Sequence, residues 1–199
     1  MAITMGGILP AFSQGYINFT YTGNTFTTGL QVGANSNPSS QQPGWYLGND
    51  YSVEAYMAAG NGAAEGSLSA VAASLIAMGF QPLPTSAAGG PGTDGSGLFQ
   101  GGAVNTGLAI GPGTIQVRVW YNPNHNMDYA SAAASGVNNG KSALYNITTV
   151  ANSDPTIKSL DDVGLAAFTV SGTSVIPEPS TFALAGLGAA AMLIFRRRK

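Results

Sequence analysis

The sequence contains no cysteine, and His125 is the single histidine among its 199 residues. Without cysteine, the chain cannot form disulfides, ligate zinc or an iron–sulfur cluster through sulfur, or use a thiol in catalysis. One histidine excludes sites built from several histidines. Charged residues are also scarce, at 8% against about 25% in an ordinary soluble protein. The sequence therefore predicts no cofactor and no metal centre.

What is abundant favours β-structure. Glycine fills 28 positions, and the Glu, Lys and Arg that long solvated helices need are few. The clearest strand is 114–121, where Ile115, Val117 and Val119 alternate with polar residues. In this pattern Gln116 and Arg118 face water, and Trp120 shares their parity, so it is predicted to be exposed. Further strands are predicted at 16–21, 29–32, 51–58, 104–108, 144–150 and 165–170.

Two segments favour helix. Residues 67–78 are alanine-rich with apolar residues at a spacing of three to four, although two short strands remain an alternative. Residues 128–135 predict a short helix with Asn126 or Asp128 as N-cap and Gly136 at its end. Together these elements predict an antiparallel β-sandwich or jelly-roll-like domain over residues 14–174, with one or two short helices.

The C-terminal end has a different composition. Residues 181–195 carry no charge and no proline, and four basic residues follow them: Arg196, Arg197, Arg198 and Lys199. As a helix the apolar run would be about 22 Å long, short of a bilayer core of about 30 Å, so a buried core helix is the alternative. The adjoining basic cluster favours a single transmembrane helix with a cytoplasmic stop-transfer end.

A proline-rich string, VIPEPST at 175–181, precedes the apolar run. Pro177 and Pro179 on either side of Glu178 favour an extended, accessible backbone. The order of this string, the apolar run and the basic end resembles the PEP-CTERM sorting signal of Gram-negative bacteria over residues 175–199. The resemblance implies recognition and processing by an exosortase, a membrane protease, at Pro177, Glu178 and Pro179. It also implies a precursor held transiently in the cytoplasmic membrane.

The N-terminal residues are apolar too, and Ala11-Phe12-Ser13 fits the small-x-small pattern before a signal-peptidase cut. No basic residue precedes the apolar stretch, so residues 1–13 predict a truncated signal peptide. The first strand of the domain is the alternative. Between the two ends, residues 14–176 carry three basic and eight acidic residues, a formal net charge of −5. Nucleic-acid binding is not expected, because it needs clustered Lys and Arg.

No motif predicts catalysis. Residues 135–142 resemble a phosphate loop, but Ser135 stands where the pattern needs glycine. His125 lies in a turn-rich loop, and a triad with Asp128 and Ser131 or Ser135 would lack separate rigid elements. The acidic residues do not specify a facing pair of the kind glycosidases use. Asp154, Asp161 and Asp162 could offer oxygens to calcium, without any repeat or loop pattern to support it.

Aromatic residues are the remaining hint of a binding role. Sugar-binding modules stack sugars on such rings, although β-sandwich cores use them as well. The candidates for carbohydrate contact are Trp45, Tyr46, Trp120 and Tyr121. The sequence thus predicts a non-enzymatic, exported structural or adhesion-type protein of the cell surface or extracellular matrix. A module that binds extracellular polysaccharide is the alternative, followed by a secreted hydrolase.

Overall fold

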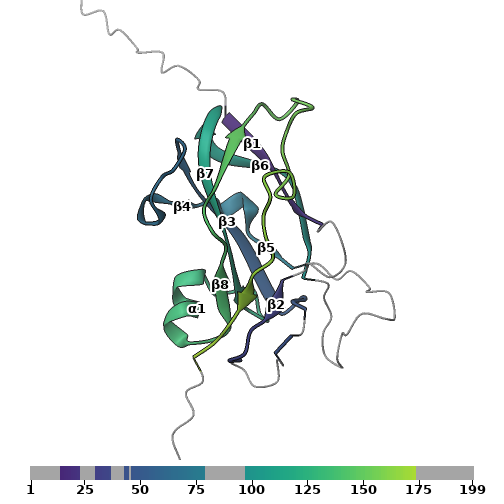
Figure 1. The fold of residues 1–199 in the computed structure, drawn as a ribbon, viewed down its shortest axis with the longest axis vertical. Helices are drawn as coiled ribbons and strands as arrows, with labels where there is room; N and C mark the ends of the chain where they lie inside the picture. Colours follow the sequence, from purple (N-terminus) through teal and green to yellow (C-terminus); the bar gives the residue numbers. More distant parts are fainter. Residues whose placement is uncertain (1–13, 23–29, 37–42, 45, 79–96, 174–199) are drawn as a thin grey trace, which may run out of the picture.

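The computed structural model describes residues 14–22, 30–36, 43–44, 46–78 and 97–173. The predicted signal peptide at 1–13 and the predicted sorting segment at 175–199 lie outside these residues. The described residues form a mainly β fold with antiparallel sheets and one short helix (Figure 1), which confirms the predicted fold class at that level. Its jelly-roll connectivity stays a prediction.

The larger sheet has six strands and is built around β3 (Tyr51–Ala59) and β7 (Gly111–Tyr121), which pair antiparallel along the whole of β3. β4 (Ser69–Ala70) and β5 (Ile76–Ala77) pair with the other edge of β3. β8 (Asn139–Lys141) and β9 (Tyr145–Thr149) pair in succession with the other edge of β7. Side chains alternate between the faces of a strand, so the apolar alternation of β7 buries one face of this sheet.

A second sheet consists of β1 (Gln14–Tyr21) and β6 (Phe99–Ala109), and β6 turns at Ile110 directly into β7. The β1–β6 register shifts twice, and β6 has a glycine with positive φ at each shift: Gly102 at 67° and Gly107 at 71°. Glycine adopts this conformation without steric cost, which allows a bulge in the longer strand. The glycines of β6 therefore let the ribbon bend without ending the strand.

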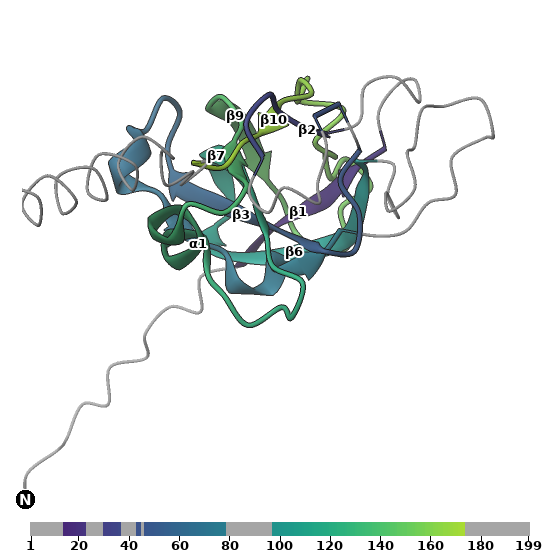
Figure 2. The ribbon, with the colours of Figure 1, turned by 90° about the horizontal axis from the view of Figure 1, so that it is seen from below.

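Figure 2 shows β1 and β6 beside β3 and β7, and the core draws on residues of both sheets. The rings of Phe19 and Phe99 contact each other across the β1–β6 pair, with centroids 4.9 Å apart. The larger sheet contributes the following fully buried side chains: Tyr51, Val53, Ala55, Ile115, Val117 and Val119. The prediction that Ile115, Val117 and Val119 face a core is confirmed.

A short parallel pair closes the described chain. β10 (Thr169–Val170) runs beside β2 (Gln31–Val32), and Ser171 then exchanges two backbone hydrogen bonds with Asn139 of β8, at 3.1 and 3.0 Å. Finally, the amide of Thr173 donates to the carbonyl of Gly136 at 2.9 Å. We call residues 169–173 the C-terminal seam. The predicted strand at 165–170 is present only as its last two residues.

The predicted helix at 67–78 is wrong, and the alternative of two short strands is correct. The segment begins at the last residue of the 3₁₀ turn η1 (Glu65–Ser67) and contains β4, the 3₁₀ turn η2 (Ala72–Ser74) and β5. Where it leaves the ladder, the hydroxyl of Ser74 accepts a hydrogen bond from the Ala55 amide at 2.7 Å and donates to the Val71 carbonyl. Pairing along β3 overrides the modest helix propensity of the alanines.

The second predicted helix is confirmed as α1 (Tyr129–Ser135), which lies beside β8 in Figure 1. The carboxylate of Asp128 accepts from the Ser131 amide at 2.7 Å and caps the first turn. Gly136, with φ 75°, ends the helix in the left-handed conformation that glycine favours. This helix covers part of the outer face of the large sheet.

Candidate functional site

The outer face of the large sheet carries the polar residues of β3 and β7, and α1 and η1 lie over it. Antiparallel pairing places Glu54 opposite Arg118 and Tyr56 opposite Gln116. The prediction that Gln116 and Arg118 face water is wrong for Gln116, which is buried, and Arg118 is half-buried. The parity was predicted correctly, but the sequence does not reveal the elements that cover this face.

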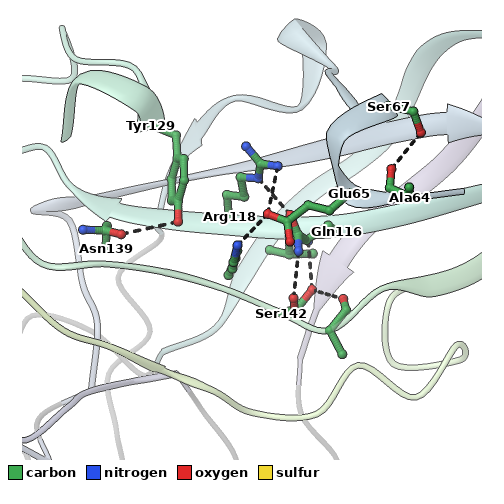
Figure 3. Close-up of polar contacts among 11 residues, drawn as sticks. Ala64, Glu65, Ser67, Gln116, Arg118, Tyr129, Asn139 and Ser142 are labelled. Carbon is green, nitrogen blue, oxygen red and sulfur yellow. Dashed lines mark hydrogen bonds and ion pairs between the residues drawn. The ribbon is translucent and has the colours of Figure 1, made fainter. Parts of the chain in front are cut away.

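Arg118 lies at the centre of this face (Figure 3). Its guanidinium carbon lies 3.8 Å from the ring centroid of Tyr56 and 5.1 Å from that of Tyr129. Its Nε donates to Oε1 of Gln116 at 2.9 Å, and its Nη2 lies 3.7 Å from Oε1 of Glu65. A planar cation over aromatic faces is favourable when it is shielded from water. We call Tyr56, Glu65, Gln116, Arg118 and Tyr129 the Arg118 cluster.

Glu65 fastens η1 to the sheet. One of its oxygens, Oε1, accepts from Nζ of Lys141 on β8 at 2.5 Å and also faces Arg118. The hydrogen bond from Lys141 holds the pKa of Glu65 below its ordinary value, and the charges of Lys141 and Arg118 act in the same direction. Gln116 reaches further along the face, because its Nε2 donates to the Ser142 carbonyl at 3.1 Å. Figure 3 shows these contacts.

Glu54 is the one buried carboxylate among the described residues, with 6% of its surface exposed. Burial raises the pKa of its carboxyl group, while a hydrogen bond with Tyr56 and the charge of Arg118 oppose the rise. A general acid can have such a perturbed pKa. Glycoside hydrolysis, however, needs a second carboxylate, and nearby Asp128 is already the N-cap of α1.

The single histidine makes a contact that the sequence does not predict. Nδ1 of His125 lies 3.2 Å from Oγ of Ser52, and Nδ2 of Asn122 donates to the same Oγ at 3.0 Å. Ser52 is only 2% exposed, so its hydroxyl does not face a substrate. The serines considered as partners make other contacts. The Ser131 amide donates to the carboxylate of Asp128, and the Ser135 hydroxyl donates to the Ala132 carbonyl. This geometry favours an ordinary loop histidine.

The prediction that Trp120 is exposed is wrong, because it is fully buried. Its Nε1 donates to the Met127 carbonyl at 2.8 Å, and its ring meets Tyr129 edge-on at 5.9 Å. Tyr46 is buried as well, and Tyr121 is half-buried against Tyr51. Trp45 lies outside the described residues. The described aromatic candidates therefore do not combine into one exposed stacking surface.

The three aspartates considered for calcium each stabilise local structure. Asp154 accepts from Thr156, Asp162 accepts from Ser159, and Asp161 accepts from Thr22. Hydrogen bonds from Thr156 and Ser159 hold the pKa values of Asp154 and Asp162 below their ordinary value. Within the described part of the chain, no group of three or more acidic or histidine side chains could hold a metal ion.

A groove of about 420 Å³ lies between β9 and the loop that follows it. Its lining is mixed: two amides, two hydroxyls, one ammonium, one carboxylate and three aliphatic side chains. These residues are Asn61, Asn146, Ile147, Thr148, Val150, Thr156, Lys158, Asp162 and Val163. None of them belongs to the Arg118 cluster. Sequence reasoning missed this groove because its residues come from a turn, a strand and a loop.

The residues predicted to form the sorting signal lie outside the described part of the chain. They are Pro177, Glu178 and Pro179 in the proline-rich string, and Arg196, Arg197, Arg198 and Lys199 at the basic end. The predicted transmembrane helix at 181–195 lies outside it too. Among the residues that the structure does describe, no helix is long and apolar enough to cross a membrane.

Comparison with known protein families settles the nature of this tail. Residues 175–199 match the PEP-CTERM protein-sorting motif. The motif implies an exported, cell-surface protein of a Gram-negative bacterium that is sorted and processed by an exosortase. The chain is therefore a protein that carries a PEP-CTERM motif, as its sequence predicts. Searches of curated proteins and of solved structures found no match.

Proposed function

We propose that the body of this protein is a non-catalytic structural or adhesion-type domain that acts at the cell surface or in the extracellular matrix. The Arg118 cluster is the observation that carries the proposal. Glu65 pairs with both Arg118 and Lys141, and these contacts, together with the ring of Tyr129 beside Arg118, fasten η1 and α1 to the sheet. Charges that could have acted on a substrate thus contribute to a rigid folded body.

The buried polar groups support the same proposal. A hydrolase of this fold would use Glu54 with a second carboxylate, or Ser52 with His125. Glu54 interacts with Tyr56 and Arg118. The buried Ser52 hydroxyl is hydrogen-bonded with His125 and Asn122. Both arrangements satisfy buried polar groups, which is what a stable fold requires of them.

The surface location is tested by cell fractionation and surface labelling. A chain that ends at Ser174 is expected to lose surface delivery, and Glu178→Ala is expected to reduce it strongly. Glu65→Ala is the matched control, because it removes a carboxylate from the folded body and is expected to be delivered normally. Unchanged delivery of the shortened chain would overturn the proposed location.

The absence of catalysis is tested with purified protein and a panel of bacterial polysaccharides. No release of reducing ends is expected from the native chain. Release that disappears in Glu54→Gln would instead assign the protein to the hydrolases.

A further inference from the structure

The groove between β9 and the following loop contains side chains that make no hydrogen bond or ion pair with the described residues. Nζ of Lys158 makes no ion pair or hydrogen bond with any described residue, and its charge acts on the Asp162 carboxylate, whose pKa it helps to lower. Asn61 makes no side-chain hydrogen bond within the described residues, and Thr148 makes none through its hydroxyl. The fold therefore leaves one cation and several neutral hydrogen-bonding groups on the wall of one groove.

Two other residues are held in place by the structure. Oδ1 of Asn146 accepts from the Gly62 amide at 3.0 Å, which orients the side chain and leaves its NH₂ group without a partner among the described residues. Oδ2 of Asp162 accepts from the amide and hydroxyl of Ser159 at 2.8 and 2.9 Å. The other oxygen of Asp162 can still accept a hydrogen bond. Donors and an acceptor are thus pre-positioned around the groove.

The remaining lining is aliphatic. The half-buried Val150 and Val163 add apolar surface among the polar groups, and Ile147, which also lines the groove, is only 3% exposed. The volume of about 420 Å³ lies within the range of about 300–1,000 Å³ typical of small-molecule sites. Such sites combine an apolar wall with a few fixed polar groups that orient the ligand. A ligand that fits this lining has many hydroxyls, one apolar face and one negative charge.

We propose that this groove binds a carboxylate-bearing sugar unit, a hexuronate, of an extracellular polysaccharide. The ammonium of Lys158 pairs with the sugar carboxylate. Asn61, Asn146 and Thr148 donate to the hydroxyls, and Asp162 accepts from one of them. The aliphatic side chains lie against the C–H face of the ring. Inorganic phosphate fits less well, because it has neither a hydroxyl-bearing ring nor an apolar face.

This inference deepens the proposed adhesion role, but the two fail separately: loss of sugar binding leaves surface delivery intact, and loss of delivery leaves binding by purified protein intact. Binding is measured by titration calorimetry on the full chain in detergent. The three probes are trigalacturonate, the neutral galactotriose and inorganic phosphate. Trigalacturonate is expected to bind at least fivefold more tightly than either of the others.

Lys158→Gln is expected to weaken trigalacturonate binding at least tenfold, and Lys158→Arg to retain most of it. Lys141→Gln is the matched control, since it removes the same charge from a lysine outside the groove and is expected to bind as the native chain does. Thermal unfolding verifies that each variant folds. Asn61→Ala is a second variant at an exposed position of the groove, and it is also expected to weaken trigalacturonate binding. Equal binding of phosphate, equal loss in both glutamine variants, or no binding of trigalacturonate at millimolar concentration would overturn the proposal.

Discussion

At the scale of single residues, the charged side chain of Arg118 stabilises the folded body through its contacts on the outer face of the large sheet. A guanidinium can stack on rings and donate in its plane at the same time, which a lysine cannot do. Here it contacts Tyr56, Tyr129, Gln116 and Glu65 together. Strand parity predicts that Gln116, Arg118 and Trp120 share a face. The sequence does not reveal that α1 and η1 cover that face, because these contacts join residues far apart in the chain.

Glu54 and Glu65 provide a prediction in which two carboxylates respond oppositely to pH. Burial raises the folded-state pKa of Glu54 above its ordinary 4.5. Its contribution to stability is therefore fully present below the unfolded-state pKa and is lost as pH rises through the folded-state pKa. Glu54→Gln keeps the neutral form at every pH. Its free energy of unfolding, relative to the native chain, is expected to rise as the pH increases above the ordinary pKa of 4.5.

Glu65→Gln is the control for this measurement. The pKa of Glu65 is lowered by Lys141, so its contribution is present above the unfolded-state pKa and is lost as pH falls. The stability of this variant relative to the native chain is expected to decrease with rising pH. Urea unfolding of the native chain, Glu54→Gln and Glu65→Gln over a series of pH values measures these two opposite trends. Parallel curves for the two variants would contradict the assignment.

At the scale of elements, the sequence predicts strands better than it predicts the segment beside β3. Alternation predicted most of β1, β3, β7 and β9 and about half of β6, because these strands have one face in the core. Residues 67–78 have no such signal, since their conformation depends on pairing with β3 and on the Ser74 hydroxyl. Residues 165–168 contribute the buried Leu165 without forming a strand. Tertiary contacts therefore decide the elements that local sequence leaves open.

Close packing between β8 and the C-terminal seam gives a prediction at Gly140. A Cβ atom placed on this residue would lie 2.8 Å from the Thr169 carbonyl oxygen and 3.1 Å from Cγ1 of Val170. Because backbone must move to make room, Gly140→Ala is expected to lower the free energy of unfolding by about 1–3 kcal/mol. Gly66→Ala is the control, since a Cβ there meets no atom within 4 Å. Equal urea midpoints for the two variants would argue against this packing.

At the scale of the whole molecule, the tail was predictable and the groove was not. A sorting motif is a continuous string, so residues 175–199 could be identified from the sequence and the family comparison agrees. The groove joins Asn61 to residues of β9 and of the loop after it, and no continuous pattern records that assembly. The same holds for Ser52 and His125, which are distant in sequence and hydrogen-bonded in the structure.

The seam predicts where the chain can be shortened. A chain that ends at Ser174 keeps every contact of Thr173 with Gly136 and is expected to unfold at the same urea concentration as the full chain. A chain that ends at Phe168 loses the fully buried Val170, worth about 1.5–3 kcal/mol, together with the hydrogen bonds of Ser171 to Asn139. Its unfolding midpoint is expected to fall markedly. Equal midpoints would show that the seam does not stabilise the body.

The position of the seam also bears on how processing of the tail affects the body. Its last described hydrogen bond, from Thr173 to Gly136, lies two residues before the matched motif begins. Proteolysis at Pro177–Pro179 would therefore cut beyond the last backbone hydrogen bond of the described residues and break none of the hydrogen bonds found among them. The exosortase could act on an already folded domain, and the released product would keep its conformation without a refolding step.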